Sequence, residues 1–285
     1  MIPAAFEYVR ATSLSQAIGL LQDDSEGTKL VAGGHTLIPT LKLRLASPAL
    51  LIDIGGIEEL KGIEIGDRIK IGALTTHAEL LASKELYDVL PIFHQAAGII
   101  ADPQVRNRGT IGGSLANADP AADWPAVIVA LNSELEIAGP NGRRHIAAKD
   151  FFVEIFTTAL ETSEILAAIH IARPISGTQF RYRKIRHPAS GYAVVGVAVA
   201  GRLKDGVVSH ASIGVTGAAG HAFAAESATE FLIGKALTRV TIEEAARLAS
   251  EQAECLSDHY ASAEYRKHLV KTEIARALAS LVKAP

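Results

Sequence analysis

At 285 residues and 30.0 kDa, the chain is long enough for about two domains of ~150 residues, and its 48% hydrophobic and 21% charged residues exclude a disordered or fibrous protein. The 28 basic and 31 acidic side chains leave a net charge of −3 with no long basic run, which argues against a nucleic-acid partner. The single cysteine, Cys255, excludes an internal disulfide and cannot by itself hold zinc or an iron–sulfur cluster.

The start of the chain lacks the pattern of a secretory signal. Residues 1–11 contain Glu7 and Arg10 and no apolar run that leads to a small-residue cleavage site. The longest apolar stretches, such as 192–201, fall short of the ~20 residues that a membrane helix needs. We therefore expect a cytoplasmic protein with no transmembrane segment.

The first half of the chain has a mixed α and β pattern. Ser13 and Gln16 form a capping-box pattern for a helix that should end near Gly27, and Thr76 and Glu79 form the same pattern for a later helix. The other elements expected before residue 101 are a strand at 29–32, a helix at 37–45, a strand at 50–54, a hairpin at 63–73 and a helix at 88–100.

An irregular segment at 101–123 combines glycines, prolines and little periodicity, and so long an ordered loop is usually functional. A helix at 124–131, a hairpin at 133–146 and a strand at 165–171 are expected after it. Turn-forming residues at 173–178 then predict a boundary between a domain of residues 1–175 and a domain of residues 176–285.

The second domain has the pattern of a sheet followed by helices. Two strands, 192–203 and 207–215, flank a hairpin turn, and Thr241 is expected to cap a helix at 241–256 that contains Cys255. The last helix is expected at 263–282. These patterns predict an α+β protein whose second, smaller domain is an antiparallel sheet packed by helices.

Several common catalytic motifs are missing from the sequence. It contains no G-x-G-x-x-G, G-x-x-x-x-G-K-[ST], H-E-x-x-H or G-x-S-x-G pattern, which disfavours a Rossmann enzyme, a P-loop NTPase, a zincin and a serine hydrolase. The ten histidines are dispersed, and none stands at metal-ligand spacing from a carboxylate. We therefore expect no metal site and no catalytic residue of the usual kinds on this chain.

Two Gly-Gly turns of matching form remain. Each enters from an apolar residue or a hydroxyl and leaves through a hydroxyl, and paired glycines permit positive φ and let successive backbone N–H groups bind one anion. Two such turns could clamp a pyrophosphate, although each could also be a tight strand-to-helix turn without a ligand. The first glycine turn comprises Ala32, Gly33, Gly34, His35 and Thr36, and the second comprises Thr110, Ile111, Gly112, Gly113 and Ser114.

Together with the segment 120–123, these turns resemble the FAD-binding motifs of the flavoprotein (medium) subunits of molybdenum hydroxylases, of the carbon monoxide dehydrogenase type and related to the FAD domain of xanthine dehydrogenase. The resemblance covers nearly the whole chain. It implies a two-part FAD-binding domain of the vanillyl-alcohol-oxidase/PCMH type. Ser114 departs from the family, which often has Asn there, and Thr36 replaces a frequent Ser.

The resemblance also implies roles for individual residues. Both glycine turns would contact the FAD pyrophosphate, and Asp123 would hydrogen-bond toward the ribose. Ile165, Leu166 and Lys184 would approach the flavin ring, and Tyr192 would lie beside the isoalloxazine. From the residues alone, Tyr192 could equally be a sheet-core tyrosine with a hydrogen-bonded hydroxyl.

The function implied by the resemblance is that of an electron-transfer subunit. A large molybdopterin subunit would oxidise the substrate, a small subunit with [2Fe–2S] clusters would carry the electrons, and this FAD would pass them to a terminal acceptor, in a dimer of heterotrimers. Exposed apolar residues are expected where a partner docks. A self-contained FAD-dependent oxidoreductase and a non-catalytic binding protein that has lost the flavin stay open as alternatives. Carbon monoxide, aldehydes, purines and N-heterocycles are all open as substrates of the complex.

Overall fold

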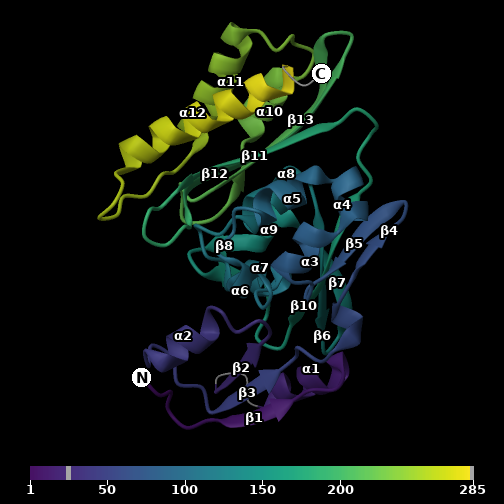
Figure 1. Cartoon of the computed structure of the whole chain (residues 1–285), viewed down its shortest axis with the longest axis vertical. Helices are drawn as coiled ribbons and strands as arrows, with labels where there is room; N and C mark the ends of the chain where they lie inside the picture. The colour runs from purple at the N-terminus through teal and green to yellow at the C-terminus, as the bar shows by residue number, and fades with distance from the viewer. Residues whose placement is uncertain (24–26, 283–285) are drawn as a thin grey trace.

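The computed structural model describes residues 1–23 and 27–282. Three units follow one another along the long axis of the molecule, with the N-terminus near one end and the C-terminus at the other (Figure 1). The first two units lie within residues 1–175 and the third lies within residues 176–285, and the division into two domains at this point stays a prediction. The expected α+β class and the antiparallel sheet packed by helices in the last unit are confirmed.

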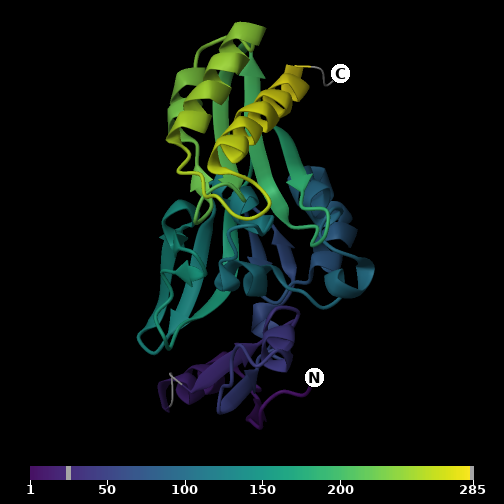
Figure 2. The ribbon, with the colours of Figure 1, turned by 90° about the vertical axis from the view of Figure 1, so that its left-hand side faces the viewer.

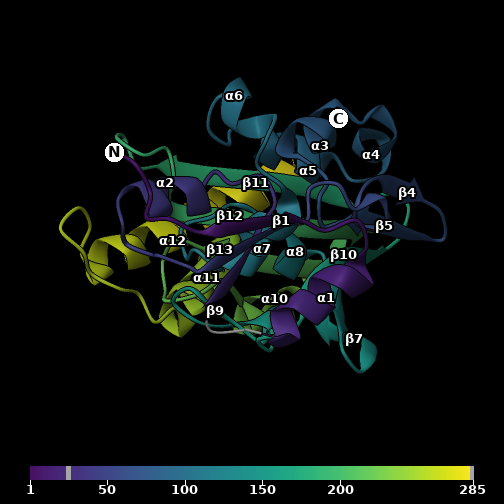
Figure 3. The same ribbon diagram turned by 90° about the horizontal axis from the view of Figure 1, so that it is seen from below.

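The N-terminal unit is a three-stranded parallel sheet with its own small core. Its strand order is β1 (Glu7–Arg10), β3 (Leu50–Asp53) and β2 (Thr28–Val31). Two helices, α1 (Leu14–Asp23) and α2 (Leu37–Lys42), lie at opposite ends of this unit (Figure 3). The apolar stripe of α1 is buried with strand β3, which is the burial that its periodicity predicts.

The caps in the first half are largely as expected. The Ser13 hydroxyl accepts from the Gln16 N–H at 3.2 Å, but the Gln16 side chain accepts from the Thr12 N–H rather than that of Ser13. The last described residue of α1 is Asp23, and residues 24–26, before the expected end near Gly27, lie outside the described residues. Thr76 and Glu79 form a complete capping box.

The middle unit is a five-stranded antiparallel sheet with helices packed on one face. The strands, in spatial order, are β4 (Ile63–Ile65), β5 (Arg68–Gly72), β10 (Ile165–Ala172), β6 (Glu134–Gly139) and β7 (Gly142–Ala147). Alternate residues of these strands join the main core, whereas the intervening residues form an outer face that is polar except where Ala138, Ile165 and Ala167 join the core of the N-terminal unit. The helices and short elements of this unit are the 3₁₀ turn η1 (Glu58–Leu60), α3 (His77–Ala82), α4 (Lys84–Val89), α5 (Pro91–Ala97), α8 (Trp124–Ala130), α9 (Ala148–Phe151), β8 (Phe152–Glu154) and β9 (Thr157–Thr158).

Two expectations for the first half are wrong. The helix expected at 88–100 is divided into α4 and α5, because Pro91 has no N–H to continue α4 and instead occupies the first turn of α5. The segment expected to be irregular contains α6 (Pro103–Arg106) and α7 (Ile111–Asn117). Asp102 and Thr110 cap these helices, and both helices are too short to show a periodic apolar stripe.

The C-terminal unit is a four-stranded antiparallel sheet between two layers of helices. Its strands are β11 (Gln179–Arg186), β12 (Ala193–Lys204), β13 (Val207–Thr216) and β14 (Phe223–Ala224). Helices α10 (Glu226–Leu232), α11 (Arg239–Gln252) and α12 (Ala263–Val282) cover its outer face (Figure 2). The last helix has the bounds that its sequence predicts.

The first helices of this unit differ from expectation. Helix α11 begins earlier than predicted, since Thr238 rather than Thr241 is its N-cap and accepts from the Thr241 N–H. Cys255 lies beyond the end of α11, where burial raises the pKa of its thiol. The sequence did not predict strand β11, because five of its eight residues are polar or charged: Gln179, Arg181, Arg183, Lys184 and Arg186.

The inner face of the C-terminal sheet packs on the middle unit. Helix α8 lies against β12 and β13, and α5 lies against β11. At the closest approach, a Cβ on Gly214 would meet the carbonyl oxygen of Ala126 at 2.1 Å. Because β12 is covered on both faces, its sequence is almost continuously apolar rather than alternating. Within the described part of the chain, no helix is both long and apolar enough to cross a membrane.

The Gly214 contact gives a test of how the units are held together. We expect Gly214→Ala to lower the free energy of unfolding by roughly 3 kcal/mol, because the added methyl group forces α8 and β13 apart. Gly19→Ala is the matched control: Gly19 lies in α1 with nothing within 4 Å of its Cβ position, so this change should stabilise by about 1 kcal/mol. Urea unfolding measures both changes, and equal stability of the two variants would contradict the close packing.

Candidate functional site

A large cleft of about 1070 Å³ lies where the three units meet. Residues of the first glycine turn, of the second glycine turn, of the start of β10 and of the segment between β11 and β12 line it. Of the fifteen residues for which the sequence suggests a role, fourteen line this cleft. The exception is Ile111, whose side chain is fully buried in the core of the middle unit.

The first glycine turn has the geometry of an anion cradle. Gly34 has a φ of +73°, and a Cβ on Gly33 would meet the Arg108 carbonyl oxygen at 2.1 Å. The turn therefore packs directly against the chain that leads into the second glycine turn. Among the described residues, the backbone N–H groups of residues 33–36 donate no hydrogen bond within the protein, and all four residues border the cleft.

The second glycine turn differs from the nest expected of it. Residues 111–114 form the first turn of α7, and their N–H groups already donate to protein acceptors, as Gly112 does to the Ala73 carbonyl. A Cβ on Gly112 would meet the Ala73 Cβ at 2.4 Å, so this glycine is required by packing rather than by positive φ. What this turn can offer the cleft are the hydroxyl groups of Thr110 and Ser114.

A buried ion pair lies deep in the cleft. Lys184 Nζ is 2.9 Å from Asp123 Oδ2, and the Tyr182 hydroxyl donates to Asp123 Oδ1 at 2.5 Å. The Lys184 side chain is only 1% exposed, although it borders the cleft. Burial raises the pKa of Asp123, with Lys184 and Tyr182 opposing the rise, and burial beside Asp123 raises the pKa of Tyr182 well above its usual value. Both carboxylate oxygens of Asp123 are thus engaged inside the protein.

Ile165, Leu166 and Tyr192 form further parts of the cleft wall. The register of β10 shifts between Leu166 and Ala168, and this irregularity lies beside the cleft. Tyr192 is 43% exposed and follows Gly191, which has a φ of +74°. The alternative of a sheet-core tyrosine is therefore wrong. Burial raises the pKa of its phenol, with Asp119 and Asp123 adding to the rise.

His77 is a cleft residue that the sequence did not reveal. Its Nδ1 accepts from the Trp124 indole N–H at 3.1 Å, which leaves Nε2 to carry the proton of the neutral ring. Burial, with His35 and Arg106 adding to its effect, lowers the pKa of His77 to about 4. The capping box at Thr76 predicts where α3 begins, but only the tertiary structure places Trp124 beside His77, the first residue of α3.

A cleft of this size at the junction of a two-part domain and a helix-covered sheet is the kind of site that a nucleotide cofactor occupies. Residues 4–174 match the family described as the FAD binding domain in molybdopterin dehydrogenase, and residues 180–281 match the CO dehydrogenase flavoprotein C-terminal domain. The chain belongs to this family of FAD-binding flavoprotein subunits of molybdopterin dehydrogenases.

The chain matches its relatives over nearly their full length. It is 39% identical to the carbon monoxide dehydrogenase medium chain of Hydrogenophaga pseudoflava, with 98% of this chain and 97% of that one covered. It is 36% identical to the glyceraldehyde dehydrogenase medium chain of Sulfolobus acidocaldarius, with 95% and 96% covered. A solved structure of carbon monoxide dehydrogenase from Hydrogenophaga pseudoflava, which lacks the Mo-pyranopterin moiety, matches with a TM-score of 0.96 at 40% identity and 99% coverage of both chains. The chain is accordingly an FAD-dependent oxidoreductase subunit.

The buried His77 predicts a pH dependence of stability. The unfolded chain binds a proton on this histidine near pH 6.5, whereas the folded chain binds it only near pH 4. Stability should therefore fall as the pH decreases through this window, by roughly 3 kcal/mol in total from this group. We expect His77→Gln to have a correspondingly smaller loss of stability between about pH 7 and pH 4.

Urea unfolding at matched FAD loading measures this difference between the variant and the wild type. The exposed His268, replaced by Gln, is the control and should keep the wild-type pH dependence. Identical pH profiles for wild type and His77→Gln would show that the histidine is not held neutral.

Proposed function

We propose that the chain is the FAD-binding subunit of a heterotrimeric molybdenum-containing hydroxylase, in which electrons from [2Fe–2S] clusters of a small partner subunit reach a terminal acceptor by way of its FAD. The substrate would be oxidised on a large molybdopterin subunit, and two heterotrimers would form a dimer in the cytoplasm. The observation that carries this proposal is the cleft between the three units with its four open N–H donors at residues 33–36.

The residues present fit FAD, and we infer the following contacts. The N–H groups of the first glycine turn would bind the diphosphate, with the Thr110 and Ser114 hydroxyl groups on the opposite side. A diphosphate bound there would meet neutral donors and no lysine. Because the N–H groups of residues 111–114 are already bonded, their role in this proposal is to position those hydroxyl groups.

Lys184, Tyr192, Ile165 and Leu166 would surround the flavin ring, which supplies one-electron and two-electron redox chemistry when bound. Asp123 would act through Lys184, since it holds that ammonium group in place beside the cleft. A direct contact between Asp123 and the ribose stays a prediction, and it would require the carboxylate to accept a third hydrogen bond.

A self-contained oxidoreductase would need an acid or a base beside the flavin. Asp123 and His77 are buried titratable groups of the cleft, and each is engaged within the protein. Moreover, the relatives are named for carbon monoxide and for glyceraldehyde, although each matches this chain along almost its whole length. These observations support a subunit that serves different substrates because partner subunits select them.

The rim of the cleft offers a surface for such a partner. Phe156 lines the cleft and is 60% exposed, and its neighbours Val153 and Ile155 are about half exposed. Three exposed apolar side chains in one short segment match the apolar contact expected at a subunit interface. We propose that the small subunit docks over this segment.

The role of the first glycine turn can be tested with a matched pair of substitutions. Gly34→Ala should raise the dissociation constant for FAD at least about tenfold, because positive φ disfavours any side chain and reorients the adjacent N–H groups. Gly206→Ala, in the β12–β13 turn with a φ of +80° and open space around its Cβ position, introduces the same strain away from the cleft.

Fluorescence titration of the FAD-depleted variants with FAD measures this effect. Both variants should lose about 1 kcal/mol of stability from the positive φ, and Gly34→Ala should lose somewhat more because its Cβ would meet Ile38 Cγ1 at 3.0 Å, but only Gly34→Ala should lose affinity for FAD. Equal affinities of the two variants for FAD would show that the diphosphate does not bind at this turn.

The relay itself predicts a dependence on the partner subunits. The isolated FAD-loaded chain should be reduced by dithionite but should not oxidise carbon monoxide, aldehydes, purines or N-heterocycles. Adding its small and large partner subunits should restore substrate-dependent bleaching of the flavin absorbance. Turnover of one of these substrates by the isolated chain at ordinary enzymatic rates would establish the self-contained oxidoreductase instead.

A further inference from the structure

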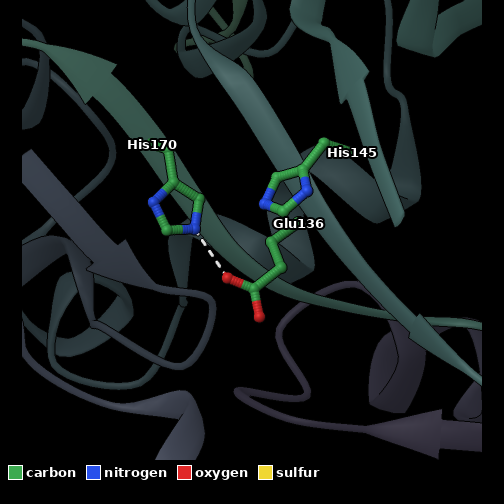
Figure 4. Close-up of side chains that lie close together, drawn as sticks. All are labelled: Glu136, His145 and His170. Carbon is green, nitrogen blue, oxygen red and sulfur yellow. Dashed lines mark hydrogen bonds and ion pairs between the residues drawn. The ribbon is translucent and has the colours of Figure 1, made fainter. Parts of the chain in front are cut away.

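The outer face of the middle sheet gathers three metal-binding side chains from three adjacent strands. Glu136 of β6 stands opposite His145 of β7 in the strand register, and His170 projects from β10 on the other side of β6 (Figure 4). One ligand atom from each of the three lies within 4.8 Å of the others. Among the described residues, no other three histidine, cysteine or acidic side chains bring their ligand atoms this close together.

The sequence gives no sign of this cluster. No short motif joins Glu136 to either histidine, and the sequence therefore predicts no metal site. The antiparallel sheet creates the proximity, because β10, β6 and β7 are neighbours in space while a long segment separates β7 from β10 in the chain. Of the three strands, β10 and β6 lie in the interior of the sheet, which leaves Glu136 and His170 little freedom to diverge, whereas β7 with His145 is the edge strand.

Glu136 is prepared to act as an anionic ligand. The residue is only 7% exposed. Its Oε2 is 2.6 Å from His170 Nε2, and its Oε1 accepts a hydrogen bond from the Arg143 guanidinium. Arg143 thus fixes one oxygen and leaves the other directed at the histidines, as outer hydrogen bonds do for ligating carboxylates.

The cations around the cluster are themselves paired with carboxylates. Arg143 also contacts Glu59 at 3.1 Å, so two carboxylates share its charge. On β5, which lies next to β10, Arg68 pairs with Glu134 of β6 and Lys70 pairs with Glu64 of β4. These pairs balance most of the positive charge that would otherwise oppose a bound cation.

We propose that Glu136, His145 and His170 form a binding site for a divalent transition-metal ion of the Zn²⁺ class. Two imidazole nitrogens and one carboxylate oxygen are a ligand set that Zn²⁺ accepts, with water in the fourth position. The ion takes the place of the proton between His170 Nε2 and Glu136 Oε2; in the neutral ring that proton moves to Nδ1, so that both imidazoles bind as neutral ligands and Glu136 as the carboxylate. Bonds of about 2.1 Å to a tetrahedral ion require the ligand atoms to be roughly 3.4 Å apart, which small side-chain rotations achieve.

The site lies apart from the FAD cleft, and its effect is structural. None of the three residues lines the cleft. Through Arg143, the cluster connects to Glu59, which accepts from the Leu14 N–H at the start of α1 in the N-terminal unit. A bound ion would therefore stiffen the outer sheet face next to the contact between the N-terminal and middle units.

Titration of the tag-free, FAD-loaded protein with Zn²⁺ by isothermal calorimetry tests the proposal. We expect one ion per chain, and we expect His145→Ala to weaken binding at least about tenfold, since losing a direct ligand should cost no less than losing an outer-shell partner. His145 is exposed, so this variant should fold, and unchanged FAD content verifies that it does. His268→Ala, an exposed histidine on α12, is the matched control and should bind as the wild type does.

Co²⁺ provides a second readout, because a tetrahedral site with nitrogen ligands gives intense visible absorption bands. These bands should form in the wild type and in His268→Ala and should be lost in His145→Ala and in Glu136→Gln. The proposal is overturned if the wild type shows no saturable binding, or if His145→Ala binds Zn²⁺ as tightly as the wild type.

Discussion

The buried ion pair between Asp123 and Lys184 is the interaction on which the arrangement of the cleft depends. Asp123 stands at the start of α8 in the middle unit, whereas Lys184 and Tyr182 belong to β11 of the C-terminal unit. Removing one partner from such a pair typically costs about 3–5 kcal/mol, because the other charge is left buried without compensation. The pair therefore fixes how the C-terminal sheet sits on the helices below it, and the same contact presents Lys184 to the cleft.

The backbone around Asp123 strengthens this junction. The Thr216 hydroxyl donates to the carbonyl oxygens of Pro120 and Ala122, and the N–H of Ala193 donates to Ala121. The segment 120–123 is thus held to β12 and β13, which explains why a stretch without periodicity is ordered. Three contacts hold the units around the cleft. They are this junction, the close packing of Gly33 against the Arg108 backbone, and the irregular start of β10. A cofactor in that space would touch all three units, so its binding would also stabilise their arrangement.

The two glycine turns show how similar sequences serve different physical purposes. In the first, Gly34 supplies positive φ and Gly33 permits close backbone approach, and the surrounding N–H groups stay open. In the second, the glycines lie in a helical turn, and Gly112 is small because Ala73 packs against it. A larger residue at Gly33 or Gly112 would disturb packing whether or not a cofactor is bound. At Gly34 the positive φ is the main requirement, because the atoms nearest to an added Cβ belong to side chains, with Ile38 Cγ1 at 3.0 Å, and not to the backbone.

The sequence by itself determined the element types where periodicity and caps are strong, as in the capping box at Thr76, the hairpins around β6 and β12, and the full length of α12. Nearly all the residues to which it gave a role line the cleft, because glycine turns and their hydroxyl groups are local patterns, but most of the cleft wall comes from residues that it did not single out. It failed where a side chain's role depends on a partner that is distant in the chain. The N–H donors of the second turn, the Trp124 partner of His77, the Lys184 partner of Asp123 and the histidines around Glu136 were decided by tertiary structure alone, since only packing sets which distant groups share a hydrogen bond or a charge.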